Sequence, residues 1–113
     1  MIKSKQKKIL VLGGTGTIGK SLIQKLIDNN FSYFSISKSS SHGNLNNNMQ
    51  CDITNFEQVN KIINEKKPDV IIHLAGLVGN IQCEKNPKQA FSTNVLGTLN
   101  VLNASLNLKP KII

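Results

Sequence analysis

The stretch Lys8-Ile9-Leu10-Val11-Leu12-Gly13-Gly14-Thr15-Gly16-Thr17-Ile18-Gly19 decides the fold of this chain. Its first five residues are almost wholly apolar, which is typical of a central parallel strand covered on both faces. Glycines then punctuate the chain, and the segment from Thr17 to Asn29 carries apolar residues at helical spacing, namely Ile18, Leu22, Ile23, Leu26 and Ile27. The pattern predicts a strand, a tight glycine turn and a helix.

A glycine turn in this position suits the phosphates of a nucleotide. One glycine permits the tight turn, the next lets the backbone approach a pyrophosphate, and the last lets the helix pack on the strand. The helix N-terminus adds N–H donors and a partial positive charge. The alternative is a bare turn without a ligand. We expect cofactor contacts from Gly13, Gly16, Thr17, Ile18 and Gly19.

Strands and helices alternate along the rest of the chain. Further strands are predicted at Phe31–Ser37, Met49–Cys51, Asp69–Ala75 and Lys111–Ile113, and a long loop precedes Asn86. Helices are predicted at Asn55–Lys66, with the face Phe56, Val59, Ile62 and Ile63, and from Pro87 to about Asn107, with the face Phe91, Val95, Leu99 and Leu102. The order predicts an α/β fold, a Rossmann-type doubly wound parallel sheet.

The length and net charge of the chain indicate how many domains it has and which partners are not expected. One domain fits the 113 residues, and the net charge of +8 comes entirely from lysine without any arginine. Arginine is the residue expected for bidentate phosphate or base contacts, so we expect no nucleic-acid partner. The cluster Lys3, Lys5, Lys7 and Lys8 is interpreted as a solvated lead-in to the first strand. No apolar run is long enough for a membrane span, so no membrane partner is expected.

The two cysteines, Cys51 and Cys83, fit no metal-ligand spacing. Isolated cysteines in a chain without a signal peptide are typical of reduced, intracellular thiols. We therefore expect a cytoplasmic protein without a metal site.

Four motifs occur in the order found in one known family. Gly13 to Gly19 resembles that family's Gly-x-x-Gly-x-x-Gly, and Cys51-Asp52-Ile53-Thr54 resembles its acidic segment after the third strand. His73-Leu74-Ala75-Gly76 resembles its His-x-Ala-(Ala/Gly), and the segment Thr93 to Leu102 is similar to its Asn-Val-x-Gly-Thr helix. Over nearly all of its length the chain thus resembles the extended short-chain dehydrogenases/reductases, which include nucleotide-sugar epimerases and dehydratases.

The resemblance implies where a dinucleotide cofactor, NAD or NADP, contacts the chain. Asp52, with Ile53 beside it, would meet the adenine. Leu74, Ala75 and Gly76 would line the ribose and nicotinamide through their backbone. Taken without the other motifs, Asp52 could instead be an acid near a helix start.

Two polar residues of these motifs have structural alternatives. Asn94 could lie close to the cofactor or could hydrogen-bond the backbone of the fourth strand. His73 lies in an apolar strand, so we expect a core histidine and assign it no role in proton transfer. Gly97 is expected to permit close packing of its helix.

The end of the second strand bears on the choice between NAD and NADP. NAD-binding relatives carry an acid there for the ribose 2′-hydroxyl, but no Asp or Glu occurs between Asp28 and Asp52. Ser37, Lys38 and Ser39 occupy the place instead. A cation and hydroxyls suit a 2′-phosphate, so NADP is slightly favoured over NAD.

The family's catalytic residues are absent from this sequence. Its catalytic Ser/Thr follows the fifth strand and its Tyr-x-x-x-Lys lies further on, whereas the only tyrosine here is Tyr33, with Ser37 four residues later. We expect residues 1–113 to be the incomplete cofactor-binding part of an epimerase, dehydratase or reductase, unable to catalyse alone. The alternative is a stand-alone NAD(P)-binding sensor or scaffold module.

Further partners follow from the same interpretation. In the complete protein the substrate would be a nucleotide sugar, and a homo-oligomer is left open. A chain ending near the fifth strand should also leave the fourth strand, Val70 to Leu74, at or near an open sheet edge, where an apolar strand invites self-association.

Overall fold

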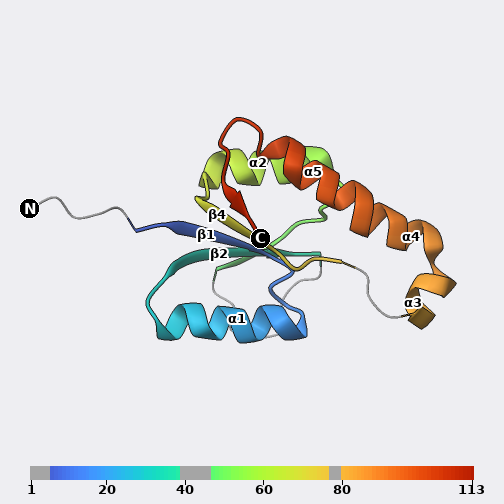
Figure 1. The fold of residues 1–113 in the computed structure, drawn as a ribbon, viewed down its shortest axis with the longest axis horizontal. Coiled ribbons are helices and arrows are strands. Elements are labelled where there is room, and N and C mark those ends of the chain that lie inside the picture. The colour runs from blue at the N-terminus through green and yellow to red at the C-terminus, as the bar shows by residue number, and fades with distance from the viewer. Residues whose placement is uncertain (1–5, 39–46, 77–79) are drawn as a thin grey trace, which may run out of the picture.

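A computed structural model describes residues 6–38, 47–76 and 80–113, and the predicted roles of Lys3, Lys5 and Ser39 lie outside these residues. Figure 1 shows the strands and helices of the described chain. The elements are β1 (Lys8–Leu12), α1 (Thr17–Asp28), β2 (Ser32–Ser37), β3 (Asn48–Gln50), α2 (Phe56–Lys66), β4 (Val70–His73), α3 (Asn80–Lys85), α4 (Pro87–Phe91), the π-helical turn η1 (Ser92–Leu96), α5 (Gly97–Ala104) and β5 (Lys111–Ile112).

The strands form one parallel sheet in the order β3-β2-β1-β4-β5. β1 pairs with β2 on one side and with β4 on the other, so the strand order reverses at β1. Ligands of open α/β sheets bind outside the carboxyl ends of the strands at such a switch point. The predicted fold class is confirmed.

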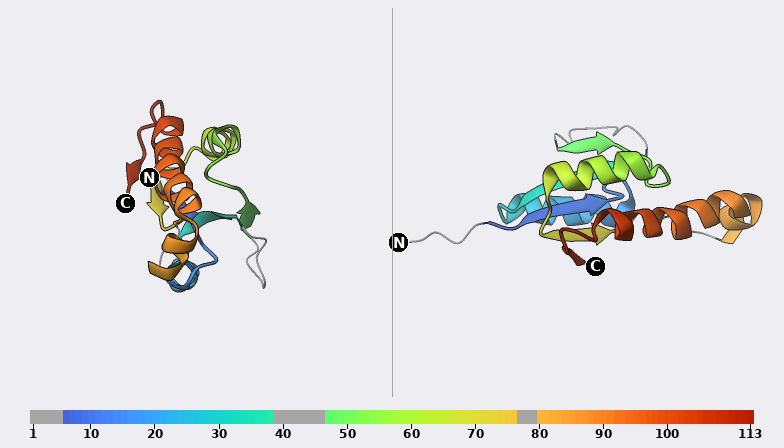
Figure 2. Two further views of the ribbon diagram at one scale, coloured as in Figure 1. Left: turned by 90° about the vertical axis from the view of Figure 1, so that its right-hand side faces the viewer. Right: turned by 90° about the horizontal axis from the view of Figure 1, so that it is seen from above.

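Helices cover both faces of the sheet, with α1 on one side and α2 and α5 on the other (Figures 1 and 2). Side chains of β1 alternate between the two layers. Leu10 and Leu12 pack in the cluster that includes Val59 of α2 and Val101 of α5, whereas Val11 packs in the cluster of α1. All three β1 side chains are fully buried, as the apolar run predicts.

Local signals set the ends of α2. Asn55 is the N-cap, and its side-chain oxygen accepts a hydrogen bond from the Gln58 backbone N–H at 3.2 Å. The helix ends where Lys67 adopts a left-handed conformation with φ of 49°. Of the predicted apolar face, Val59, Ile62 and Ile63 are buried.

β4 lies one strand in from the edge of the sheet, near the edge as expected, because β5 pairs with it and the His73 N–H donates to Ile113 O at 2.8 Å.

The structure corrects two expectations. The predicted loop before Asn86 contains the short helix α3. The second correction concerns the helix after Pro87, whose predicted face is turned to solvent. Its buried side consists of small or β-branched residues instead, namely Gly97, Val101 and Ala104.

Candidate functional site

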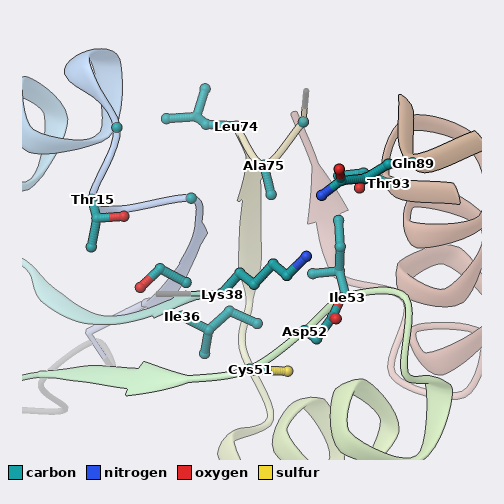
Figure 3. A pocket seen from close by; sticks show the side chains of 14 residues that line it. Thr15, Ile36, Lys38, Cys51, Asp52, Ile53, Leu74, Ala75, Gln89 and Thr93 are labelled. Carbon is teal, nitrogen blue, oxygen red and sulfur yellow. The ribbon is translucent and has the colours of Figure 1, made fainter. Parts of the chain in front are cut away.

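A cleft of about 270 Å³ opens at the carboxyl ends of the strands (Figure 3). Residues that follow β1, β2, β3 and β4 contribute to it, and α4 and η1 close its far side. Its lining consists of Gly13, Thr15, Gly16, Ile36, Ser37, Lys38, Cys51, Asp52, Ile53, Leu74, Ala75, Gly76, Gln89 and Thr93.

The turn after β1 is tightly packed at three of its glycines. Gly13 has a φ of +90°, and a Cβ there would lie 2.8 Å from the backbone N of Ala75. A Cβ on Gly19 would collide with the carbonyl oxygen of Gly13, so α1 packs directly on the turn. A Cβ on Gly14 would lie 2.7 Å from Ile23 Cδ1. The turn therefore requires glycine at Gly13 and Gly19, where a Cβ would meet backbone, whereas at Gly14 it would first meet the end of a side chain.

Gly16 differs, because nothing in the protein crowds it. A Cβ at Gly16 would meet only the Gly13 carbonyl oxygen, at an ordinary contact distance of 3.6 Å. Gly16 is also the N-cap of α1, makes no side-chain cap, and is followed by a first turn without acidic residues. The first N–H groups of a helix lack intrahelical partners, so this end of α1 is suited to an anion.

Ser37 and Lys38 mark the end of β2. Ser37 is buried, and its hydroxyl lies 3.1 Å from the Nδ2 donor of Asn48 in β3. The side chain of Lys38 extends along the cleft in Figure 3, toward the side where Asp52 lies. This end of the cleft thus presents a cation.

Asp52 is held by its own short turn. Burial alone would raise the pKa of Asp52, but hydrogen bonds from the Thr54 hydroxyl and backbone N–H, together with the charge of Lys38, lower it. Asp52 is therefore ionised at neutral pH. Asp52 precedes α2 but is not its N-cap, which is Asn55.

Cys51, next to Asp52, also lines the cleft. Burial, with a smaller contribution from the Asp52 charge, raises the pKa of the Cys51 thiol to about 11. A thiol that stays protonated at neutral pH is a poor nucleophile. Cys51 therefore contributes shape rather than reactivity to this wall.

The segment after β4 forms the floor of the cleft with Leu74, Ala75 and Gly76. Asn94 lies over this floor, since its Oδ1 would be 3.0 Å from a Cβ on Gly76. Asn94 is not among the lining residues, whereas its neighbour Thr93 is.

Most of the sequence-predicted contact residues meet in this cleft, but four do not line it: Thr17, Ile18, Gly19 and Asn94. The first three form the start of α1 behind Gly16. Sequence reasoning missed Thr15, Ile36, Cys51, Gln89 and Thr93. Thr93 directly precedes a motif residue and Gln89 lies one helical turn earlier, so the helical period was the signal available for them.

No three His, Cys, Asp or Glu side chains of the described part of the chain lie together as a metal ion would need. Among the same residues, no helix is long and apolar enough to cross a membrane.

Comparison with known proteins agrees with this geometry. A family model described as the NAD dependent epimerase/dehydratase family matches residues 9–113. The bifunctional UDP-glucose 4-epimerase and UDP-xylose 4-epimerase 1 of Pisum sativum is 31% identical over 117 residues, which cover 89% of this chain and 33% of that protein. The chain spans about a third of the length of the curated relatives it matches.

Two solved structures are similar in fold and sequence. L-threonine dehydrogenase from Clostridium difficile superposes with a TM-score of 0.84 at 29% identity, over 96% of this chain and 36% of that one. The dTDP-4-dehydrorhamnose reductase from Bacillus anthracis, in complex with NADP, gives a TM-score of 0.82 at 27% identity, over 98% of this chain and 36% of that one.

Proposed function

Because the chain belongs to the NAD-dependent epimerase/dehydratase family, we propose that residues 1–113 bind the dinucleotide cofactor of a nucleotide-sugar epimerase, dehydratase or reductase. The observation that carries the proposal is the glycine turn at the switch point of the sheet. Gly13 and Gly19 are needed for the turn itself, whereas Gly16 leaves an open approach to uncapped N–H groups. A pyrophosphate is the ligand that such a helix N-terminus suits best.

The remaining walls fit the rest of a dinucleotide. From the turn, the cleft runs past Lys38 and Asp52 on one side and past Ala75 on the other. An ionised carboxylate accepts hydrogen bonds, as the exocyclic amine of an adenine would require. When bound, the nicotinamide would supply the hydride chemistry, and this chain's residues would hold and orient it.

We propose NADP as the slightly preferred cofactor. Lys38 is the exposed cation at the end of β2, and no acid stands there to pair with a ribose 2′-hydroxyl. The similar dTDP-4-dehydrorhamnose reductase was solved with NADP, whereas the family description names NAD. The preference therefore depends on Lys38.

The experiment is a calorimetric titration of the purified chain with NADP and NAD, beside the variant Gly16→Val. The added Cβ meets only an ordinary contact in the protein, and the side chain stands in the phosphate approach, so binding should be lost while the circular dichroism spectrum and the melting temperature are retained. Binding that persists in Gly16→Val at wild-type affinity would remove the turn from the site.

The substrate of the complete protein is proposed as a nucleotide sugar, because the Pisum sativum relative is named for UDP-glucose and UDP-xylose. A second candidate is an amino acid such as L-threonine, which the similar L-threonine dehydrogenase favours. Turnover assays of the full-length protein with UDP-glucose and with L-threonine distinguish the two classes.

We further propose that the protein acts in the cytoplasm, where thiols stay reduced. Cys51 is buried as a free cysteine in the structure. Fractionation of cells that express the tagged full-length protein tests this location.

A further inference from the structure

His73 has no part in the binding proposed above, yet it is tightly constrained beside the cleft. It is the last residue of β4, and the cleft floor begins with the next residue, Leu74. The ring Nε2 lies 2.8 Å from the hydroxyl oxygen of Thr98 in α5. The imidazole thus joins the central sheet to the helix that follows the cleft wall.

The hydrogen bond that the Thr98 hydroxyl donates determines which ring nitrogen of His73 carries a hydrogen. Thr98 donates its single hydroxyl hydrogen to the backbone carbonyl of Asn94 at 2.8 Å. It cannot donate to His73 as well, so His73 Nε2 must carry a hydrogen and donate to Thr98 Oγ1. A neutral His73 is therefore the Nε2–H tautomer.

The other ring nitrogen opposes protonation of His73. Nδ1 is buried and has no hydrogen-bond partner within the described chain. A charged imidazole would place an N–H at this position and leave it unpaired, and burial accordingly lowers the pKa of His73. His73 thus serves Thr98 as a neutral donor.

Thr98 in turn bonds to a distorted part of the helix. Asn94 lies within the π-helical turn Ser92–Leu96, and a hydroxyl bonded to the carbonyl four residues earlier is a recognised cause of helix bending. Isolated π turns occur frequently at functional sites. This one lies at the cleft, where Thr93 and, one turn earlier, Gln89 form the wall.

Two contacts on the same turn of α5 complete the attachment of the helix. Asn100 Nδ2 donates to the backbone oxygen of Ile53 at 2.9 Å. Gly97 packs so closely on Ile53 that a Cβ there would lie 2.6 Å from Ile53 Cδ1. The helix is therefore fixed to β4 through His73 and to the segment after β3 through Ile53, and both segments line the cleft.

We propose that His73 is a positioning residue for the cofactor site: its Nε2–H holds Thr98, and through Thr98 the π turn, in the arrangement that directs Thr93 and Gln89 to the cleft. The inference rests on the proposed function, since it assumes that the cleft takes a dinucleotide. His73 itself does not contact the cofactor and moves no proton.

The test uses pairs of variants that keep or remove one hydrogen-bonding group. Thr98→Ser keeps the hydroxyl and Thr98→Val removes it, while His73→Gln keeps an N–H donor and His73→Leu removes it. Ser105→Ala is the matched control, because Ser105 makes the same kind of bond to the carbonyl four residues earlier, Val101 O, farther along the helix from the cleft.

NADP affinity and melting temperature are measured for each variant. Thr98→Val and His73→Leu should each weaken NADP binding about tenfold, and their combination should be no worse than either alone, because both break one chain of bonds. Thr98→Ser, His73→Gln and Ser105→Ala should bind within about twofold of wild type, even where Ser105→Ala melts lower.

Three results would overturn the inference. The first is wild-type NADP affinity in Thr98→Val and His73→Leu, and the second is a loss in Ser105→Ala that matches theirs. The third is read from the wild type alone: ¹⁵N–¹H correlation of the His73 ring must show the Nε2–H tautomer, and the Nδ1–H tautomer contradicts the proposal even if the variants do not fold. If the wild type binds neither NADP nor NAD, the result contradicts the proposed function rather than this inference.

Discussion

At the residue scale, Lys38 is the side chain on which cofactor preference depends. Its charge lowers the pKa of Asp52, so replacing it with an acid would disturb Asp52 too. The cleaner change is Lys38→Met, which removes the charge and keeps most of the length of the side chain. We expect NADP affinity to fall about tenfold and NAD affinity to change less than about twofold, since a hydrogen bond to a charged group contributes about 1.5–3 kcal/mol. Equal losses in parallel titrations of the two cofactors would exclude Lys38 from the 2′-phosphate site.

Cys51 makes the folded state sensitive to alkali. The pKa of its thiol rises from 9.0 to about 11 on folding, so between these values the unfolded chain releases a proton that the folded chain keeps. The contribution to stability is complete below pH 9 and is lost as the pH rises toward 11. Urea unfolding at pH 8 and pH 10.5 should show a larger loss of stability for the wild type than for Cys51→Ala. Identical losses would contradict a buried neutral thiol.

Prediction from sequence succeeded best where a backbone requirement is local. The glycine turn is an example, because Gly13 needs a positive φ and Gly19 needs close contact within a few residues. The contributions of Gln89 and Thr93 to the cleft depend instead on a π turn and on contacts with distant strands. The helical period relates Gln89 to Thr93, but it does not indicate that the π turn brings both to the cleft.

At the scale of elements, the helix from Pro87 to Ala104 shows how a periodic pattern can mislead. The large apolar residues were expected to face the sheet, but close packing is made by the small Gly97 and by Ala104, which let the helix backbone approach. The large residues lie outside as an exposed apolar row, which consists of Phe91, Val95, Leu99, Leu102 and Leu106. Both sides of the helix are apolar, so period alone could not choose between them.

Since β5 pairs with β4, we expect self-association through this exposed apolar row rather than through the fourth strand. The side chains of the row are between 45% and 67% exposed, which is costly for large apolar groups in water. We expect the purified chain to form dimers at micromolar concentrations through the row. The double variant Leu99→Gln, Leu102→Gln should be monomeric in sedimentation velocity.

Ile27→Gln is the control for that comparison. Ile27 is exposed to a similar degree, 47%, but lies on α1 at the opposite face of the sheet. It should leave the dimer intact. A wild type that sediments as a monomer at every concentration would contradict the prediction, and the same is true of a dimer that survives the double change.

At the scale of the whole molecule, we expect residues 1–113 to bind a dinucleotide without catalysing a reaction. The cleft has groups that can position a dinucleotide, but in the described residues Cys51 is protonated, Asp52 is ionised with one oxygen held by Thr54, and His73 is committed to Thr98. General acid–base catalysis contributes about 10²–10⁴ in rate. We therefore expect no oxidation or reduction of nucleotide sugars by residues 1–113 alone, as followed by the absorbance of the reduced nicotinamide. Turnover that is lost in Gly16→Val would show that these residues contain a base.

The overall architecture was easier to predict from the sequence than the details of the site. Alternating buried strands and helices left few topologies that obey right-handed crossover connections, and the parallel sheet follows from them. The strand predicted at Lys111–Ile113 is also found, as β5, and it pairs with β4 although it is only two residues long and exposed.

The central claim is that a dinucleotide binds at the carboxyl ends of the strands with its phosphates at the glycine turn. The most direct measurement follows the backbone amides of the ¹⁵N-labelled chain by NMR during a titration with NADP. The account predicts saturable shifts at Gly13–Gly19, with further shifts at Lys38, Asp52 and Gly76. It is contradicted if no amide shifts with saturation, or if the shifts gather at the opposite end of the sheet, around Ser32–Phe34.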